Sequence, residues 1–269
     1  MSTFVMNADK GLISRRFAQA LATYEEQAQV QALVADTLLA YLSEALPAAK
    51  PQTALEIGCC TGMLTEKIAA GLPSLAHLTV CDLVAAFQGC IASKSRGWRQ
   101  QVTFLAGDIE KVVLPQRYDL ILSSSTLHWV HDFPALSCKL ARHLNEQGTL
   151  AIALYGPDNF MEIREITGSG LRYHSLDELE HILSRHFQVH IARESREQLW
   201  FADPLAMLHH LRDTGVNALS SRVWTRGRLA AFAAAYRERF GSDRGVCLTY
   251  HPLFFIASKA KGRPLPPPA

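Results

Sequence analysis

Residues 53–63 read Thr-Ala-Leu-Glu-Ile-Gly-Cys-Cys-Thr-Gly-Met, and this stretch decides the fold. Its apolar first half predicts a short strand, its two glycines predict a turn, and the chain from Leu64 onward predicts a helix. Because Gly58 and Gly62 carry no Cβ, a ligand can approach the backbone of this turn closely. Dinucleotide sites use the same geometry, so the spacing alone does not name the ligand.

Two carboxylates narrow the range of ligands that the glycine turn could bind. Glu56 lies inside the predicted strand, where a lone buried carboxylate is costly unless it meets a cation or hydrogen-bond donors. Asp82 ends the next apolar strand, at roughly the distance downstream that is expected for an acid that binds ribose hydroxyls. The alternative is a plain α/β turn with two structural glycines, and Asp82 together with the later motifs disfavours it.

The composition indicates a folded globular protein. The chain has 269 residues, 48% of them apolar, and a formal net charge of +2, which is not the strongly basic balance of a nucleic-acid binder. We find no signal peptide and no apolar stretch long enough to cross a bilayer. The six cysteines lack metal-ligand spacing and suit reduced thiols, so we expect a cytoplasmic protein without a metal site.

Strands and helices alternate along residues 53–155, which predicts an α/β fold with a doubly wound, mostly parallel sheet. The predicted strands are 54–57, 78–81, 102–105, 118–123 and 149–155. The predicted helices after the one that starts near Leu64 are 84–94 and 134–144. Residues 145–148 are expected to form a turn.

The flanking regions do not follow this alternation. Apolar residues recur at helical spacing over residues 14–46, before the first strand. The elements predicted after residue 156 are helices at 176–186, 204–214 and 225–240, and strands at 189–191, 199–201 and 248–258. Ser175 and Glu178 form a capping box at the first of these helices. Pro252 suggests a strand start or a sheet edge.

This pattern divides the chain into four parts. They are an N-terminal helical cap (1–50), a cofactor-binding core (51–156), a lid region with the final strands (157–258) and a proline-rich tail expected to be disordered (259–269).

The glycine turn with Asp82 resembles the first motif of the class I S-adenosylmethionine-dependent methyltransferases, which have a Rossmann-like fold. In that family the run is usually Glu/Asp-x-Gly-x-Gly-x-Gly, and Cys60 replaces the middle glycine here. Cysteine is small enough for the turn to form, although it crowds a cofactor that passes close to it. The resemblance implies S-adenosyl-L-methionine as the cofactor. The cofactor-binding residues it implies are Glu56, Gly58, Cys60, Gly62, Asp82, Leu83, Asp108, Ile109 and Ser124.

Asp108 follows the third predicted strand. In the resembling family an aspartate here accepts a hydrogen bond from the adenine amino group, while neighbouring backbone amides hold the ring. The alternative is that Asp108 caps a turn.

The segment at 124–129 follows the fourth predicted strand. Since ligands bind beyond the carboxyl ends of parallel strands, this segment is expected to face the transferred methyl group. His128 could act as a general base, but methyl transfer to a carboxylate needs none, so we interpret it as lining the pocket. Tyr24 is expected to line the pocket from the N-terminal cap, with a role as a core aromatic as the alternative.

The flanking segments are similar to those of the malonyl-acyl-carrier-protein O-methyltransferases of biotin synthesis, over nearly the whole chain. The similar runs are Arg16-Phe17, Tyr24-Glu25, Ala28-x-Val30-Gln31, Ala106-Gly107-Asp108-Ile109-Glu110, Leu127-His128-Trp129, Tyr155-Gly156-Pro157-Asp158, Arg172-Tyr173-His174-Ser175, Leu199-Trp200-Phe201, the block 208–216 and Leu248-Thr249-Tyr250-His251. The chain departs from that family at Cys60 and at His128, where a glutamine is more usual.

The resemblance implies methylation of the free carboxylate of a malonyl thioester, on acyl carrier protein or coenzyme A, by an enzyme expected to be a monomer. A malonyl carboxylate is held best by a bidentate guanidinium. Arg164 and Arg172 are the candidates for this role, and solvated surface arginines are the alternative. Tyr24, His128, Arg164 and Arg172 together form the expected catalytic set.

Carrier proteins are acidic, so their docking surface should be locally basic. A dense basic stretch comprises Arg222, Arg226, Arg228, Arg237 and Arg239, with Trp224 inside it. We interpret this stretch as the carrier-protein face, with a solvated helix surface as the alternative.

Two other functions remain as hypotheses, and a third is disfavoured. The first is a methyltransferase for a small free carboxylic acid, of the aconitate type, which would act on a free acid and not on a carrier thioester. The second is a non-catalytic binding module, which failure to bind S-adenosylmethionine would favour. A nucleic-acid methyltransferase is disfavoured, because the chain lacks both a strongly basic balance and an Asn/Asp-Pro-Pro-aromatic run after the fourth strand.

Overall fold

The computed structural model describes residues 4–6, 8–46, 50–216 and 225–260. A seven-stranded sheet forms the core, in the order β4-β3-β2-β5-β6-β12-β8. The bounds of its strands are Thr53–Ile57 (β2), His77–Asp82 (β3), Gln101–Ala106 (β4), Tyr118–Ser124 (β5), Leu144–Tyr155 (β6), Phe187–Glu194 (β8) and Pro252–Lys259 (β12). Only β12 runs against its neighbours in this sheet, which confirms the predicted α/β fold class.

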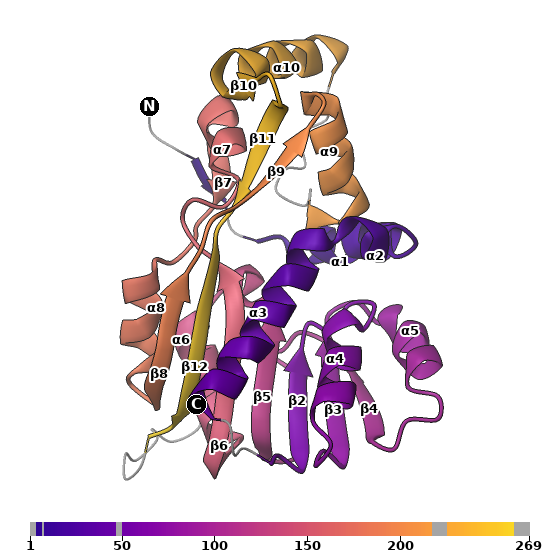
Figure 1. The fold of residues 1–269 in the computed structure, drawn as a ribbon, viewed down its shortest axis with the longest axis vertical. Coiled ribbons are helices and arrows are strands. Elements are labelled where there is room, and N and C mark those ends of the chain that lie inside the picture. Colours follow the sequence, from indigo (N-terminus) through magenta and orange to yellow (C-terminus); the bar gives the residue numbers. More distant parts are fainter. Residues whose placement is uncertain (1–3, 7, 47–49, 217–224, 261–269) are drawn as a thin grey trace.

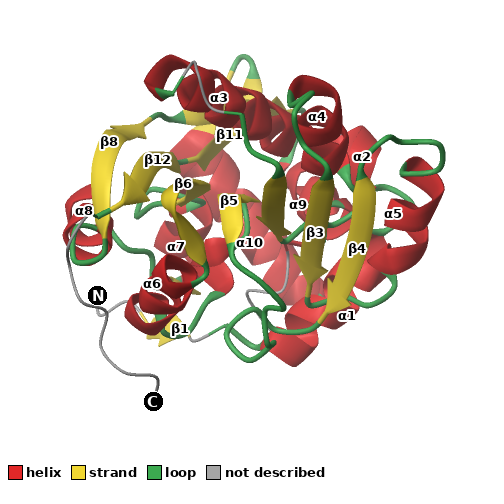
Figure 2. Ribbon diagram, turned by 90° about the horizontal axis from the view of Figure 1, so that it is seen from below, coloured by secondary structure: helices red, strands yellow, loops and turns green. Residues whose placement is uncertain are grey.

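Helices cover both faces of the core sheet (Figures 1 and 2). Their bounds are Gln29–Ala45 (α3), Met63–Gly71 (α4), Phe87–Lys94 (α5), Phe133–Arg142 (α6) and Leu176–Leu183 (α8). Successive strand residues point to opposite faces, so Ala54 packs in the cluster with α3 and α4, whereas Leu55 packs with α6 and α8. Glu56 therefore shares the face of Ala54, beneath α4. The near-continuous apolar character of β2 and β5 follows from burial on both faces.

A smaller layer lies beyond the carboxyl edge of the core strands (Figure 1). We call it the lid. Its elements are Met161–Thr167 (α7), Ser169–Leu171 (β7), Glu197–Phe201 (β9), Pro204–Asp213 (α9), Arg226–Phe240 (α10), Gly241–Ser242 (β10) and Gly245–Tyr250 (β11). Strands β10, β11 and β9 form a three-stranded antiparallel sheet.

Pro252 separates the lid from the core. The single strand predicted at 248–258 is two strands, because β11 pairs with β9 in the lid whereas β12 lies between β6 and β8 in the core. Pro252 begins β12, so the predicted strand start is confirmed, and the sheet-edge alternative is wrong because β12 is an interior strand.

The helical periodicity over residues 14–46 corresponds to three helices. They are Lys10–Ala20 (α1), Tyr24–Gln27 (α2) and α3. At the break after α1, the Thr23 hydroxyl donates to the carbonyl of Asp213 at the end of α9, at 2.8 Å. This tertiary contact anchors the turn that brings Tyr24 over the core.

Two local predictions need correction. The turn expected at 145–148 is wrong, because β6 extends through it and the side chain of Asn145 donates to Asp119 at 2.7 Å. The helix at 176–186 ends at Leu183, although its capping box between Ser175 and Glu178 is confirmed. The short elements Phe4–Met6 (β1), Leu127–Trp129 (η1), α7, β7 and β10 were not predicted.

Some predictions fall outside the described residues, namely those for Arg222, Trp224 and the tail from residue 261. In the part of the chain that the structure describes, no helix has the length and apolar character needed to span a membrane, and no group of side chains is arranged to hold a metal ion.

Candidate active site

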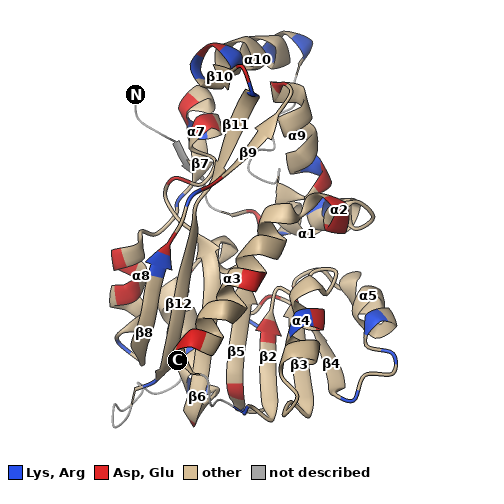
Figure 3. Cartoon of the chain, in the orientation of Figure 1, with Lys and Arg blue, Asp and Glu red and all other residues tan. Residues whose placement is uncertain are grey.

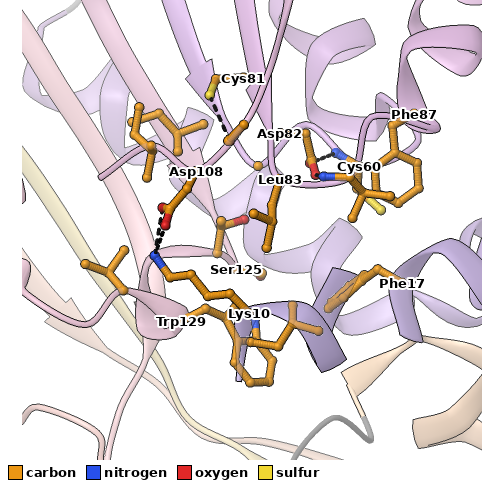
Figure 4. A pocket seen from close by; sticks show the side chains of 18 of the residues that line it. Lys10, Phe17, Cys60, Cys81, Asp82, Leu83, Phe87, Asp108, Ser125 and Trp129 are labelled. Atoms are coloured by element: carbon orange, nitrogen blue, oxygen red, sulfur yellow. Dashed lines mark hydrogen bonds and ion pairs between the residues drawn. The ribbon is translucent and has the colours of Figure 1, made fainter. Parts of the chain in front are cut away.

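A cavity lies at the carboxyl ends of β2, β3, β4 and β5, and α1 and α2 cover it (Figure 4). We call it the cofactor cavity; it contains about 740 Å³ of space including its mouth. Eight of the predicted site residues line it. They are Tyr24, Gly58, Cys60, Asp82, Leu83, Asp108, Ile109 and Ser124.

The two glycines of the turn serve different contacts. Gly58 has φ +79°, and a Cβ at this position would overlap the side chain of Thr126, so only glycine fits. Gly62 has φ +98°, and a Cβ there would meet Ile91 Cδ1 at 3.0 Å. Gly62 lies outside the cavity lining and makes room for α5, whereas Gly58 lines the cavity itself.

Cys60 lies in the cavity wall with a backbone that favours glycine. Its φ of +48° is in the left-handed region, which is uncommon for a residue with a side chain. Its amide donates to Asp82 Oδ2 at 2.9 Å, which ties the glycine turn to the end of β3. Burial and the nearby Asp82 carboxylate raise the pKa of the Cys60 thiol, so the thiol stays protonated.

Asp82 is the central carboxylate of the cavity (Figure 4). It is 8% exposed, and its Oδ1 accepts from the Val84 amide at 2.8 Å. Burial raises the pKa of Asp82 to about 6, and the hydrogen bonds from the Val84 and Cys60 amides oppose that rise. At neutral pH the side chain is therefore an oriented anion that lines the cavity.

Glu56 lies behind the cavity wall rather than in it. It is 1% exposed, and among the described residues neither carboxylate oxygen has a hydrogen-bond partner at bonding geometry. Burial raises the pKa of Glu56 to about 8, with the nearby Thr65 hydroxyl opposing the shift and Asp82 adding to it. Without a cationic ligand, the carboxyl group is mostly protonated at neutral pH.

Replacement of Glu56 by glutamine is expected to change the pH dependence of stability. A folded-state pKa of about 8 against the ordinary 4.5 means that the native state prefers the protonated acid. The contribution of Glu56 to the free energy of unfolding is therefore greatest below pH 4.5 and falls by about 3 to 5 kcal/mol as the pH rises towards 8. Urea unfolding of the ligand-free protein is measured at pH 5, 6.5 and 8. Between pH 5 and pH 8, the free energy of unfolding of Glu56→Gln should rise by that amount relative to that of the wild type. A difference that stays constant with pH would contradict the assignment.

Lys10 of α1 reaches across the mouth of the cavity to Asp108 (Figure 4). Its Nζ lies 2.7 Å from both Asp108 carboxylate oxygens and also binds Glu110. Partial burial would raise the pKa of Asp108, but the hydrogen bond from Lys10 outweighs it and the pKa is lowered. Asp108 therefore stays ionised and holds the covering helix, a contact that the sequence pattern did not reveal.

A second cavity adjoins the first, and Val130 lines both. We call it the outer cavity. His128, Tyr155 and Tyr173 form part of its wall. Burial lowers the pKa of His128 to about 3, so its imidazole is neutral, and its Nδ1 has no hydrogen-bond partner among the described residues. A neutral, buried imidazole fits the predicted pocket-lining role better than that of a base working near neutral pH.

The two candidate arginines occupy different places. Arg172 lines the outer cavity with an exposed side chain. Arg164, on α7, lines neither cavity, and its Nη1 donates to the carbonyl of Pro157 at 2.6 Å. The structure therefore does not bring Arg164 and Arg172 together with Tyr24 around one point.

Sequence reasoning missed several residues of the cofactor cavity. The N-terminal helix contributes Lys10, Ile13 and Phe17, and the start of α5 contributes Phe87. Ile13 and Phe17 are four residues apart on one helix face, which is the signal that could have identified them.

The fold and this site define a class I S-adenosylmethionine-dependent methyltransferase. Residues 55–152 match the family described as "Methyltransferase domain". The YcgJ protein of Bacillus subtilis has the same fold, with a TM-score of 0.61 and 14% identity over 84% of this chain and all of that one. The N-methyltransferase NodS of Bradyrhizobium japonicum, solved with S-adenosyl-L-homocysteine, matches 84% of this chain and 87% of that one, with a TM-score of 0.50 and 16% identity.

The similarity to curated sequences is more specific. The chain is 35% identical to the malonyl-[acyl-carrier protein] O-methyltransferase of Bacteroides thetaiotaomicron over 263 residues, which cover 94% of this chain and 99% of that one. The protein thus belongs to the malonyl-acyl-carrier-protein O-methyltransferase family. This result confirms the family inferred from its sequence motifs.

The cavity fits S-adenosylmethionine, the cofactor of this class. The Ser124 hydroxyl in the cavity wall is buried without a hydrogen-bond partner among the described residues, and Asp82 presents an oriented carboxylate. A ligand that carries positive charge and ribose hydroxyls would satisfy such groups. Asp82 would hold the ribose, Asp108 and the Ile109 segment the adenine, and the turn at Gly58 the amino-acid end. The bound cofactor supplies a sulfonium methyl group.

Proposed function

We propose that this protein methylates the free carboxylate of a malonyl thioester carried by acyl carrier protein. The observation that supports this most strongly is the extent of the similarity: it covers 94% of the chain and so includes the lid, whereas the general methyltransferase match ends at residue 152. The N-terminal helices cover the cofactor cavity, and residues 171–174, which lie beyond the general match, line one side of the outer cavity.

The arrangement of the two cavities suits this reaction. With the cofactor bound, a carboxylate oxygen of the substrate would attack the sulfonium methyl carbon, so a C–O bond would form while the C–S bond would break and its electron pair would go to sulfur. No proton moves, because the acceptor is already an anion at neutral pH. The protein has to align oxygen, carbon and sulfur and exclude water. A thioester in the outer cavity would bring its carboxylate to the cofactor cavity at their common boundary.

The product is a malonyl methyl ester on the carrier protein. Masking the charge makes the acyl end resemble an ordinary fatty-acyl end, and fatty-acid synthesis could then elongate it towards the pimeloyl group of biotin. We further propose that the enzyme works as a monomer in the cytoplasm, and the free state of all six cysteines supports a reducing compartment.

Mass spectrometry of malonyl-carrier protein after incubation with the enzyme and S-adenosylmethionine tests the proposal. A gain of one methyl group is expected, and acetyl-carrier protein, which has no free carboxylate, should gain none. Absence of the methyl group with cofactor binding intact would overturn the substrate assignment. Activity on free acids such as aconitate would then support the alternative substrate class.

The basic stretch on α10 is the proposed carrier-protein face (Figure 3). Arg226 and Arg228 are exposed in the first turn of α10, where positive charge opposes the helix dipole. Arg237 is also exposed, whereas Arg239 pairs with Glu165 at 2.6 Å. The unfavourable position of Arg226 and Arg228 supports the proposal that an anionic partner binds this surface.

Reversing the charges with Arg226→Glu and Arg228→Glu is expected to raise KM for malonyl-carrier protein about tenfold. KM for malonyl-coenzyme A and the cofactor Kd should stay unchanged, because the mutated residues lie outside both cavities. The matched control is the pair Arg96→Glu and Arg117→Glu. Both arginines are exposed, and they precede β4 and β5, at the amino ends of the core strands and away from the lid. Equal effects of the two pairs, or an unchanged carrier KM, would rule out this face.

A further inference from the structure

Two hydroxyl groups meet where the cofactor cavity adjoins the outer cavity. Ser125 lines the cofactor cavity, Tyr155 lines the outer cavity, and their side-chain oxygens lie 3.1 Å apart. Figure 4 shows Ser125 on the wall of the cofactor cavity, beyond the end of β5. The pair is thus the direct side-chain connection between the compartment for the cofactor and the compartment proposed for the acyl group.

The structure holds both hydroxyls firmly. Ser125 has φ +56°, a left-handed conformation that is uncommon for serine, and its amide donates to the carbonyl of Ala153 at 2.8 Å. Tyr155 is 3% exposed, and its ring packs against His128 at 5.0 Å and Tyr250 at 5.7 Å between centroids. Strained backbone at a cavity wall is typical of functional positions.

A third hydroxyl, in the wall of the cofactor cavity, belongs to Tyr24 of α2. Tyr24 is 8% exposed and lines the cofactor cavity together with Ser125. Burial, the Cys60 thiol and the Tyr155 hydroxyl all raise the pKa of Tyr24, in that order. All three hydroxyls are neutral at physiological pH and each can donate one hydrogen bond.

Among the described residues that line the cofactor cavity, no cation is free. Lys10 is bound by Asp108 and Glu110. Arg172 is exposed, and His128 is neutral because burial lowers its pKa. At the junction itself, the side-chain groups that the structure shows in contact are the Ser125 and Tyr155 hydroxyls, whereas Arg172 lies in the wall of the outer cavity.

The charge balance of the reaction makes this arrangement favourable. An anion and a sulfonium become an uncharged ester and an uncharged thioether, so the negative charge on the carboxylate decreases towards the transition state. A guanidinium on that carboxylate would stabilise the ground state more than the transition state and would slow the transfer. Neutral hydroxyls also orient the carboxylate oxygen atoms, but they stabilise the ground state less than a guanidinium does and so raise the activation free energy less.

We propose that the Ser125 and Tyr155 hydroxyls bind the substrate carboxylate and align it for methyl transfer. The inference rests on the proposed function, and it replaces Arg164 and Arg172 as the predicted holders of the carboxylate. One carboxylate oxygen accepts from the hydroxyl pair while the other forms the new C–O bond as the C–S bond breaks, and no proton is transferred.

The test compares Tyr155→Phe and Ser125→Ala with Tyr118→Phe. Tyr118 is a matched control because its hydroxyl is buried without a hydrogen-bond partner among the described residues and it lines neither cavity. Each junction variant should lose 10- to 100-fold in kcat/KM for malonyl-coenzyme A. The double variant should lose little more than the worse single one, since the two hydroxyls act as a unit.

Binding measurements separate positioning from structural damage. In the presence of S-adenosylhomocysteine, calorimetry should show weaker binding of malonyl-coenzyme A to the junction variants and unchanged binding of acetyl-coenzyme A, which has no carboxylate. Cofactor Kd and Tm should match those of the Tyr118→Phe control. Wild-type kcat/KM in both junction variants, together with a large loss in Arg172→Ala, would overturn the inference.

Failure of the proposed function gives a different result. In that case the wild type itself would methylate no malonyl thioester. If it methylates a free carboxylic acid instead, the same variants assayed on that acid should show the same loss, because the inference concerns the carboxylate.

Discussion

Replacing Asp82 by alanine is expected to weaken cofactor binding about 100-fold or more and to reduce methyl transfer accordingly. The carboxylate accepts hydrogen bonds from the amides of Cys60 and Val84 and would also accept from the ribose hydroxyls. Each hydrogen bond to a charged group contributes about 1.5 to 3 kcal/mol, and about 1.4 kcal/mol corresponds to a tenfold change in affinity. Loss of the ribose contacts together with loosening of the glycine turn therefore accounts for the expected factor.

Calorimetry with S-adenosylhomocysteine measures this effect. Asp36→Ala is a suitable control, because Asp36 lies on the surface of α3, where it pairs with Lys67. It should leave the cofactor Kd unchanged. Asp82→Asn should show an intermediate affinity, since its single side-chain carbonyl can replace only part of the acceptor set. Cofactor affinity within threefold of the wild type in Asp82→Ala would show that Asp82 has no role in binding.

The core of the fold could be predicted from the sequence because its signals are local. Strand β2 and the two glycines already indicate the turn in the local sequence, and the Ser175 capping box indicates the start of α8. The lid was less predictable. Strands β11 and β12 are adjacent in sequence and belong to different sheets, and only their distant partners β9 and β6 determine this.

The site shows the same division between local and tertiary information. Asp82 and Asp108 end strands, so parallel topology alone brings them to one edge. Lys10 and Tyr155 belong to segments far away in sequence, and their roles depend on how α1 packs over the cavity and how β6 ends beside η1. A lone lysine or tyrosine carries no local signal for such contacts, whereas the predicted role of Arg164 and Arg172 rested on guanidinium chemistry and not on their position in the fold.

Gly58→Ala is expected to have the largest effect on stability of any substitution in the glycine turn. The added Cβ would overlap the side chain of Thr126, and φ is +79°. A strained backbone together with a steric overlap in a packed region should cost about 3 kcal/mol or more. The displaced turn would also carry the Cys60 amide away from Asp82, so cofactor affinity should fall as well.

Gly89→Ala provides the matched control for Gly58→Ala. Gly89 lies inside α5, and a Cβ there has open space around it. Alanine in a helix interior should stabilise the protein by about 0.5 to 1 kcal/mol, so the two identical changes should have opposite signs. Urea unfolding without cofactor measures both. If Gly58→Ala lowers the free energy of unfolding by less than 1 kcal/mol, Thr126 can move aside. The close contact with Thr126 would then not explain the glycine at this position.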